Sequence, residues 1–104
     1  MLLHVGPADA TEARAWIQDA VAAGRYIVHP HLTRRCAERR ISLWEIKQAI
    51  RDTGSCLPYS ERTPTAGGTN WRLTGRTRDG EELTIGVEAF LDHLGRRALL
   101  ITVF

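Results

Sequence analysis

The chain has little cysteine, almost no lysine and no long apolar run. The shortage of cysteine excludes a disulfide-rich protein, and the lack of a long apolar run excludes a membrane-spanning helix. Two cysteines, Cys36 and Cys56, are too few for a disulfide framework, so we expect a cytoplasmic protein with reduced thiols. No apolar run approaches the ~20 residues that a membrane-spanning helix needs. The first ten residues lack a basic region followed by a long apolar one, which predicts no signal peptide.

The rest of the composition is that of an ordinary globular protein. It is 43% hydrophobic and 25% charged, without a low-complexity tract. A chain of 104 residues can bury a core of its own, so we expect a single domain over residues 1–104. Within it we distinguish an N-terminal helix in residues 1–24 from the remaining core in residues 25–104.

Positive charge is concentrated in one segment. Residues 25–51 carry seven cations and two acids, a local charge of +5, whereas the whole chain has a net charge of +2. Such a concentration predicts an anionic partner. Thirteen of the fourteen cations are arginine. A GC-rich genome produces the same bias, but the guanidinium group is the better phosphate ligand whatever its origin.

Apolar spacing predicts three helices in the first half of the chain. The first covers residues 9–23, with Asp9 or Thr11 as the cap and Gly24 as the stop. After a short extended piece at residues 26–28, the second covers residues 31–40.

The third helix opens at Ser42, where Ser42 and Glu45 form a capping box, and ends at Gly54. We expect the three tryptophans, Trp16, Trp44 and Trp71, to anchor the core.

The second half of the chain predicts strands. Residues 56–60, 69–77, 81–90 and 98–104 alternate or are wholly apolar, and Asp79-Gly80 is a hairpin turn signal. In the second of these strands, Trp71 and Leu73 face one way and Arg72 and Thr74 the other. The expected class is α+β, with N-terminal helices packed on one face of an antiparallel meander.

Three segments together resemble a known family. The stretches "HLTRRCAERRIS", "WRLTGRTRDGEELTIGV" and "LLITVF" are similar to the bacterial domain-of-unknown-function family 4258 over about residues 25–104. That resemblance implies a small domain related to the RelE-like and barnase-like ribonuclease folds, where toxins of bacterial toxin–antitoxin pairs are common. The positions that match the family pattern are His31, Arg35, Glu38, Arg39, Ile41 and Ser42. The chain departs from it at Arg40, where the family has glycine, and at Leu32, where it has alanine.

The matched residues include a set suited to phosphoryl chemistry. Residues four apart on a helix drift by only ~40° around the axis, so His31, Arg35 and Arg39 share one face. A histidine exchanges protons near neutral pH, and guanidinium groups stabilise charge that grows on a phosphate. We therefore predict these three residues as catalytic in RNA cleavage without a metal or cofactor. The predicted substrate-binding residues are Arg34, Arg40, Arg72, Thr74, Arg76 and Tyr59.

Other interpretations of the same residues remain open. His31 is also suited to a structural hydrogen bond at a helix start, a common role for such a histidine, and arginines at helical spacing often form a solvated face. A metal site at "HPH" lacks a second ligand pair, and His31 and Cys36 lie ~140° apart on a helix, which excludes a nucleophile pair.

The function predicted first is a toxin-type ribonuclease that acts on RNA, on or off the ribosome, with an antitoxin protein as partner. The alternatives are a module that binds RNA or an acidic protein without catalysis, and a sheet edge that binds a peptide.

Overall fold

The computed structural model describes residues 5–104, which form three helices and five strands. Residues 1–4, part of the start that predicts no signal peptide, lie outside the described residues. The elements run in the order α1 (Ala10–Ala22), β1 (Tyr26–Val28), α2 (Pro30–Arg39), α3 (Leu43–Arg51), β2 (Thr53–Pro58), β3 (Thr69–Arg76), β4 (Glu82–Asp92) and β5 (Gly95–Val103). Among residues 5–104, no helix has the length and apolarity that crossing a membrane requires.

The five strands form one mixed sheet in the order β1-β5-β4-β3-β2. Strands β2 to β5 are the antiparallel meander that the sequence predicts. The sheet is not wholly antiparallel, because the short strand β1 pairs in parallel with β5, with Ile27 opposite Leu99. This long-range pairing makes β5 an interior strand, which is why its sequence is apolar on both faces.

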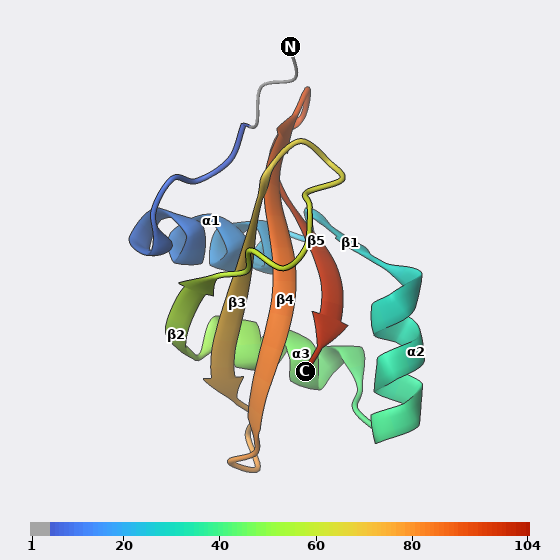
Figure 1. The fold of residues 1–104 in the computed structure, drawn as a ribbon. Coiled ribbons are helices and arrows are strands. Elements are labelled where there is room, and N and C mark those ends of the chain that lie inside the picture. Colours follow the sequence, from blue (N-terminus) through green and yellow to red (C-terminus); the bar gives the residue numbers. More distant parts are fainter. Residues whose placement is uncertain (1–4) are drawn as a thin grey trace.

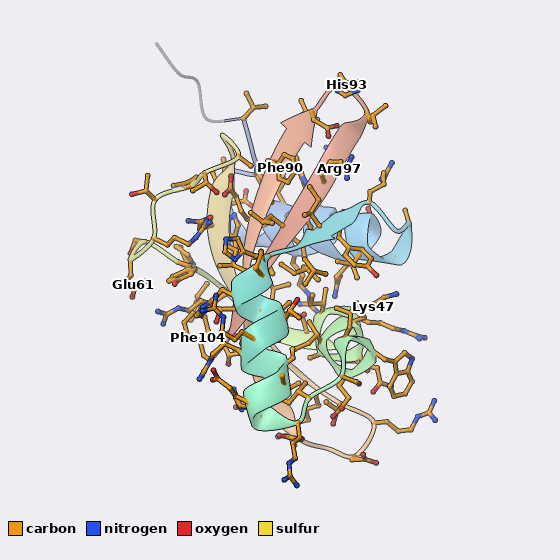
Figure 2. All side chains as sticks on the ribbon, turned by 90° about the vertical axis from the view of Figure 1, so that its right-hand side faces the viewer. Lys47, Glu61, Phe90, His93, Arg97 and Phe104 are labelled. Carbon is orange, nitrogen blue, oxygen red and sulfur yellow. The ribbon has the colours of Figure 1, made fainter. Side chains whose placement is uncertain are left out.

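Two helices cover one face of the sheet, and the third lies at its edge. Figure 1 shows α1 and α3 behind the strands, where they enclose the main core with the inward side chains of β3, β4 and β5. Helix α2 buries only Leu32 fully and packs along β5 beyond the end of β1. In Figure 2, α2 is nearest the viewer, with Phe104 and Glu61 on one side of it and Lys47 on the other. The α+β class is confirmed, with one helix at the edge rather than on the face.

Local signals set the starts of α1 and α3 as predicted, whereas α2 starts at Pro30 rather than at residue 31 and one helix stop differs. Asp9 caps α1, and Ser42 and Glu45 form the capping box of α3. Gly54 does not end α3, since the helix stops at Arg51 and Gly54 belongs to β2. The Thr53 hydroxyl donates to the carbonyl of Ile50 at 2.6 Å, which satisfies a helix-end acceptor without a glycine.

Two of the three tryptophans anchor the core. Trp16 and Trp71 are buried, and their indole N–H groups donate to the Arg97 carbonyl and the Thr69 hydroxyl. Trp44 does not, because it is 53% exposed on the outer side of α3. Its neighbour Ile46 faces the core instead.

The sheet face opposite α1 and α3, which we call the open face, is shaped by a bulge in β5. The register shifts between Gly86 and Val87, so that Ile101 is an extra residue in β5. Ile101 packs with Leu99 and Phe90 in a small second cluster on the open face. Phe104, which follows β5, then contacts Tyr59 in the loop that joins β2 to β3.

Candidate nucleic-acid interface

The N-terminus of α2 is fixed by His29, a residue to which the sequence analysis assigns no role. The imidazole Nδ1 of His29 accepts a hydrogen bond from the His31 backbone N–H at 3.0 Å, and Pro30 occupies the first helical turn. The His29 backbone N–H donates to the carbonyl of Leu100 in β5 at 2.9 Å. Helix α2 is therefore tied to β5 at its first residue, and "HPH" is a helix cap here.

The C-terminus of α2 explains the departure at Arg40. This residue has φ 54 and ψ 45, the left-handed conformation in which helices usually end with glycine. Its N–H donates to the Ala37 carbonyl at 3.4 Å, and the Ile41 N–H donates to Cys36 at 2.9 Å. The two bonds form a helix-terminating motif that requires a left-handed residue, so Arg40 presents a cation at a glycine position.

Two of the predicted catalytic residues reach the end of β5, and the third stays in solvent. The Arg35 Nε donates to the Val103 carbonyl at 3.3 Å, and an Arg39 guanidinium nitrogen donates to the Phe104 carbonyl. His31 is exposed, and within residues 5–104 its imidazole makes no hydrogen bond.

Both arginines retain donors for another ligand. A guanidinium group has five N–H donors, and within residues 5–104 Arg35 forms a single ion pair, to Glu38 at 3.5 Å. Arg35 and Arg39 thus point the same way from α2, toward the border of the open face.

A third guanidinium lies on the open face beside them. The Arg72 guanidinium carbon is 4.9 Å from the Tyr59 ring centroid and 4.5 Å from that of Phe104. The two rings meet edge to face at 5.3 Å. Glu61 pairs with Arg72 at 3.2 Å, although its side chain is 62% exposed. The Arg72 Nε is buried without a hydrogen-bond partner among the described residues. The stacked rings fix this guanidinium in place while its outer edge faces a weakly held carboxylate.

A glycine makes room for this arrangement. A Cβ on Gly86 would lie 3.2 Å from the Tyr59 ring and 3.4 Å from the Phe104 ring. The strand therefore offers a flat patch over which both rings settle. Phe104 as a residue is 42% exposed, which leaves access for a planar group to stack on it.

The loop that carries Tyr59 and Glu61 is held to the sheet by one buried carboxylate. Glu88 is fully buried and accepts hydrogen bonds from the backbone N–H groups of Thr65, Ala66 and Gly68 at 2.7–3.0 Å. Arg62 pairs with it at 3.2 Å. Because the loop supplies nearly all the partners of this charge, the charge in turn fixes the loop over the open face.

The other predicted binding residues are spread around this cluster. The Thr74 hydroxyl shares a 2.8 Å hydrogen bond with Thr84 in the middle of the open face. Arg76 is exposed farther along β3 and donates to the Gly80 carbonyl at 3.4 Å. Arg34 on α2 and Arg40 just after it are exposed and form no ion pair within residues 5–104. The structure thus joins Arg35, Arg39, Arg72 and Tyr59 around Phe104, with Arg34 and Arg76 outside that group.

The cysteines do not provide a nucleophile. Burial raises the pKa of the Cys36 thiol, with Arg39 opposing the shift and Glu45 adding to it. Burial also raises the pKa of Cys56 to about 11, against an opposing effect of Arg14. Both thiols are protonated at neutral pH, whereas thiol nucleophiles need a lowered pKa. Among the described residues, no group of three or more His, Cys, Asp or Glu side chains is placed to bind a metal ion.

Sequence reasoning missed three residues of the site, namely Phe104, Glu61 and Glu88. Glu88 left a signal, since it is the one charge in the apolar stretch from Leu83 to Leu91. Phe104 and Glu61 left none, because their contact with Arg72 depends on how β5 and the β2–β3 loop meet. No family model, curated protein or solved structure matches this chain.

Proposed function

We propose that the chain is a RelE-like or barnase-like ribonuclease domain of the toxin type, which binds RNA across the open face and cleaves it without a metal. The resemblance to domain-of-unknown-function family 4258 suggests the class. Helices on one side of a sheet and a free sheet face on the other agree with such a fold. An antitoxin protein is the expected partner.

The observation that carries the proposal is the convergence at Phe104. Arg39 from α2 and Arg72 from β3 come from distant parts of the chain and meet at Phe104, and Arg35 binds the carbonyl of its neighbour Val103. Guanidinium groups hold phosphates, and exposed rings stack bases, so the combination fits single-stranded RNA. In the free protein, Glu61 covers the outer edge of Arg72, and a phosphate of the RNA displaces that exposed carboxylate.

Metal-free cleavage then needs two proton transfers around a held phosphate. A base removes the proton of the 2′-hydroxyl, whose oxygen bonds to phosphorus, and the 5′-oxygen leaves with a proton from an acid. The products are a 2′,3′-cyclic phosphate and a 5′-hydroxyl. His31 is the candidate for one transfer and Tyr59 for the other, while Arg35 and Arg39 stabilise the phosphorane charge.

The test is single-turnover cleavage of end-labelled RNA in excess EDTA, with and without ribosomes. We expect cleavage by the wild-type protein, and a rate lower by ~10²-fold or more in His31→Ala and in Arg39→Ala. His93→Ala, an exposed histidine in the β4–β5 turn, is the matched control and should keep the wild-type rate. Circular dichroism must show that all variants are folded.

A second function is favoured by the surroundings of His31. No side chain among residues 5–104 orients its imidazole by a hydrogen bond, whereas catalytic histidines usually have such a partner. The alternative is a module that binds RNA or a protein without cutting. RNA binding by the wild type with no cleavage in either assay format would establish this alternative and reject the ribonuclease.

A further inference from the structure

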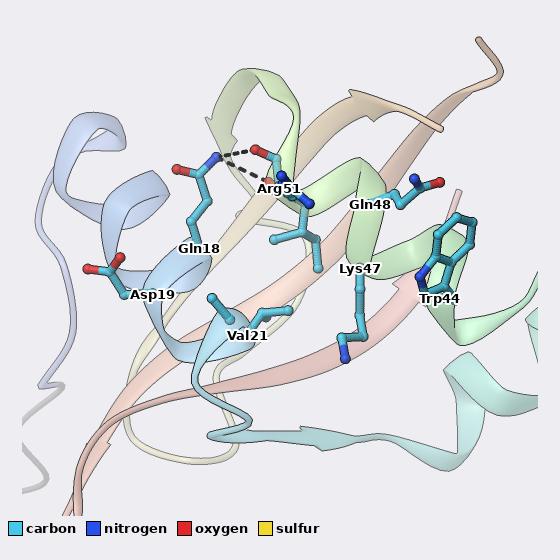
Figure 3. A pocket seen from close by; sticks show the side chains of 9 residues that line it. Gln18, Asp19, Val21, Trp44, Lys47, Gln48 and Arg51 are labelled. Atoms are coloured by element: carbon cyan, nitrogen blue, oxygen red, sulfur yellow. Dashed lines mark hydrogen bonds between the residues drawn. The ribbon is translucent and has the colours of Figure 1, made fainter. Parts of the chain in front are cut away.

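A second surface, on the opposite side of the molecule, has features of a peptide-binding site. A groove of about 520 Å³ lies between α1 and α3. Figure 3 shows it with Gln18 at one end and Trp44 at the other. The open face lies on the other side of the sheet, as the positions of Lys47 and Phe104 in Figure 2 show. This groove is independent of the proposed RNA site.

The floor of the groove is apolar and rigid. Val21 and Ile50 lie at its base and are almost fully buried in the core. The Gln18 amide spans the groove and donates to the carbonyls of Ile50 and Arg51, both at 3.1 Å. These bonds fix the separation of α1 and α3, so the groove is present before any partner binds. Its volume is within the usual range of ligand sites, about 300–1,000 Å³.

The rim carries an exposed aromatic ring among cations. Trp44 is 53% exposed, and Arg78 from the β3–β4 turn stacks on it at 5.2 Å. Lys47 and Arg51 follow on the same face of α3, and Lys47 lies 5.3 Å over the Tyr26 ring. Tryptophan and arginine are the residues that most often dominate binding energy at protein interfaces.

The charges at the groove select the occupant. Lys47 and Arg51 line it, and Arg78 adds a third cation through Trp44, against the single carboxylate of Asp19. No ion pair within residues 5–104 neutralises any of these three cations. We propose that the groove between α1 and α3 binds a short acidic segment of another protein, with an apolar side chain of that segment packed on Trp44, Val21 and Ile50.

Binding of the acidic segment requires neither RNA nor catalysis. The carboxylates of the segment pair with Lys47 and Arg51, and its apolar side chain occupies the floor between them. Lys47 and Arg51 lie one helical turn apart on α3, beside the apolar floor, which fits a segment that alternates acidic and apolar side chains. The two surfaces can therefore be tested separately.

The experiment selects ligands without assuming their sequence. A phage library of random 12-residue peptides is panned on the wild-type protein, and clones that also bind the double variant Trp44→Ala, Lys47→Glu are discarded. The selected peptides should be rich in Asp and Glu and contain an aromatic or large aliphatic residue. The affinity of synthetic, fluorescein-labelled copies is then measured by anisotropy. A second copy of each peptide, in which lysine replaces every glutamate, serves as the charge control.

We expect Trp44→Ala and Lys47→Glu each to weaken binding of the acidic peptide by ~10-fold or more, the threshold of an interface hot spot. The matched controls are Leu94→Ala, an exposed apolar residue in the β4–β5 turn, and Arg34→Glu on α2. Both should stay within twofold of the wild type. In NMR spectra, the indole N–H signal of Trp44 is identified by its absence from the spectrum of Trp44→Ala. In the wild type, this signal should shift when the peptide is added.

Three results would overturn the proposal. One is enrichment of peptides that lack acidic residues, or a panning in which every clone that binds the wild type also binds the double variant. Another is a loss of single-stranded RNA binding in Lys47→Glu that matches the loss in Arg39→Ala, because the groove would then belong to the RNA surface. The third is a dimer of the wild-type chain that Trp44→Ala dissociates in sedimentation, since a second copy would then cover the groove.

Discussion

Replacing Arg40 by glycine should stabilise the fold and weaken RNA binding together. Arg40 has φ 54, where a residue with a Cβ loses about 1–2 kcal/mol. Glycine removes that cost, but its freer unfolded chain returns about 0.4–1 kcal/mol. The expected net gain in the free energy of unfolding is therefore centred on ~0.8 kcal/mol, within limits of about 0 and 1.6 kcal/mol, and the central value corresponds to a rise in Tm of a few degrees for a domain of this size.

The assay is urea unfolding of the wild type, Arg40→Gly and Arg40→Ala. The alanine variant removes the same charge but keeps the Cβ, so it should gain nothing in stability. Both variants should lose the same RNA affinity, because both lose one cation next to Arg39. If Arg40→Gly proves no more stable than Arg40→Ala, the account of the helix end is refuted.

The remaining predictions concern the buried carboxylate and the thiols. Glu88→Gln should cost about 3–5 kcal/mol in unfolding free energy. Both carboxylate oxygens of Glu88 accept hydrogen bonds, whereas an amide has one acceptor oxygen and no charge to pair with Arg62. The exposed Glu82→Gln should change the urea midpoint little, and equal midpoints for both variants would contradict the role of Glu88. Cys56 should resist iodoacetamide at neutral pH and react faster as pH rises toward 11, since only the thiolate attacks. Alkylation is measured by mass spectrometry, and rapid alkylation of the folded protein at pH 7 would contradict the raised pKa. Because the pKa of Cys56 is raised from 9.0 in the folded state, its contribution to stability should be complete below pH 9 and be lost as pH rises through 11, which thermal melts of wild type against Cys56→Ala can follow.

Local patterns were enough to predict most of the elements. The capping box at Ser42 and Glu45 and the cap at Asp9 depend on residues at most three apart, and both are confirmed. The meander follows from alternation and from the Asp79-Gly80 turn, where Gly80 has φ 81. Such signals are short-range, so a single sequence carries them in full.

What the sequence could not give are the long-range pairings. Strand β1 is three residues long and joins β5 about seventy positions later, with nothing in its sequence to choose a parallel partner. Trp44 lies beside the apolar stripe of α3, and only the packed helix shows that it points outward. In the site, helical spacing placed Arg35 and Arg39 on one face, but the stacking of Arg72 on Phe104 needs the whole sheet.

The most direct test of the central claim is the salt dependence of RNA binding. Anisotropy of a labelled single-stranded RNA is measured from low to moderate salt for the wild type, Arg39→Ala and Arg51→Ala. Each lost phosphate contact should lower the slope of log K against log salt by about 0.7. We expect that decrease in Arg39→Ala only, because Arg51 lies in the groove between α1 and α3. Equal slopes for all three proteins, or no binding at low salt, would contradict the account.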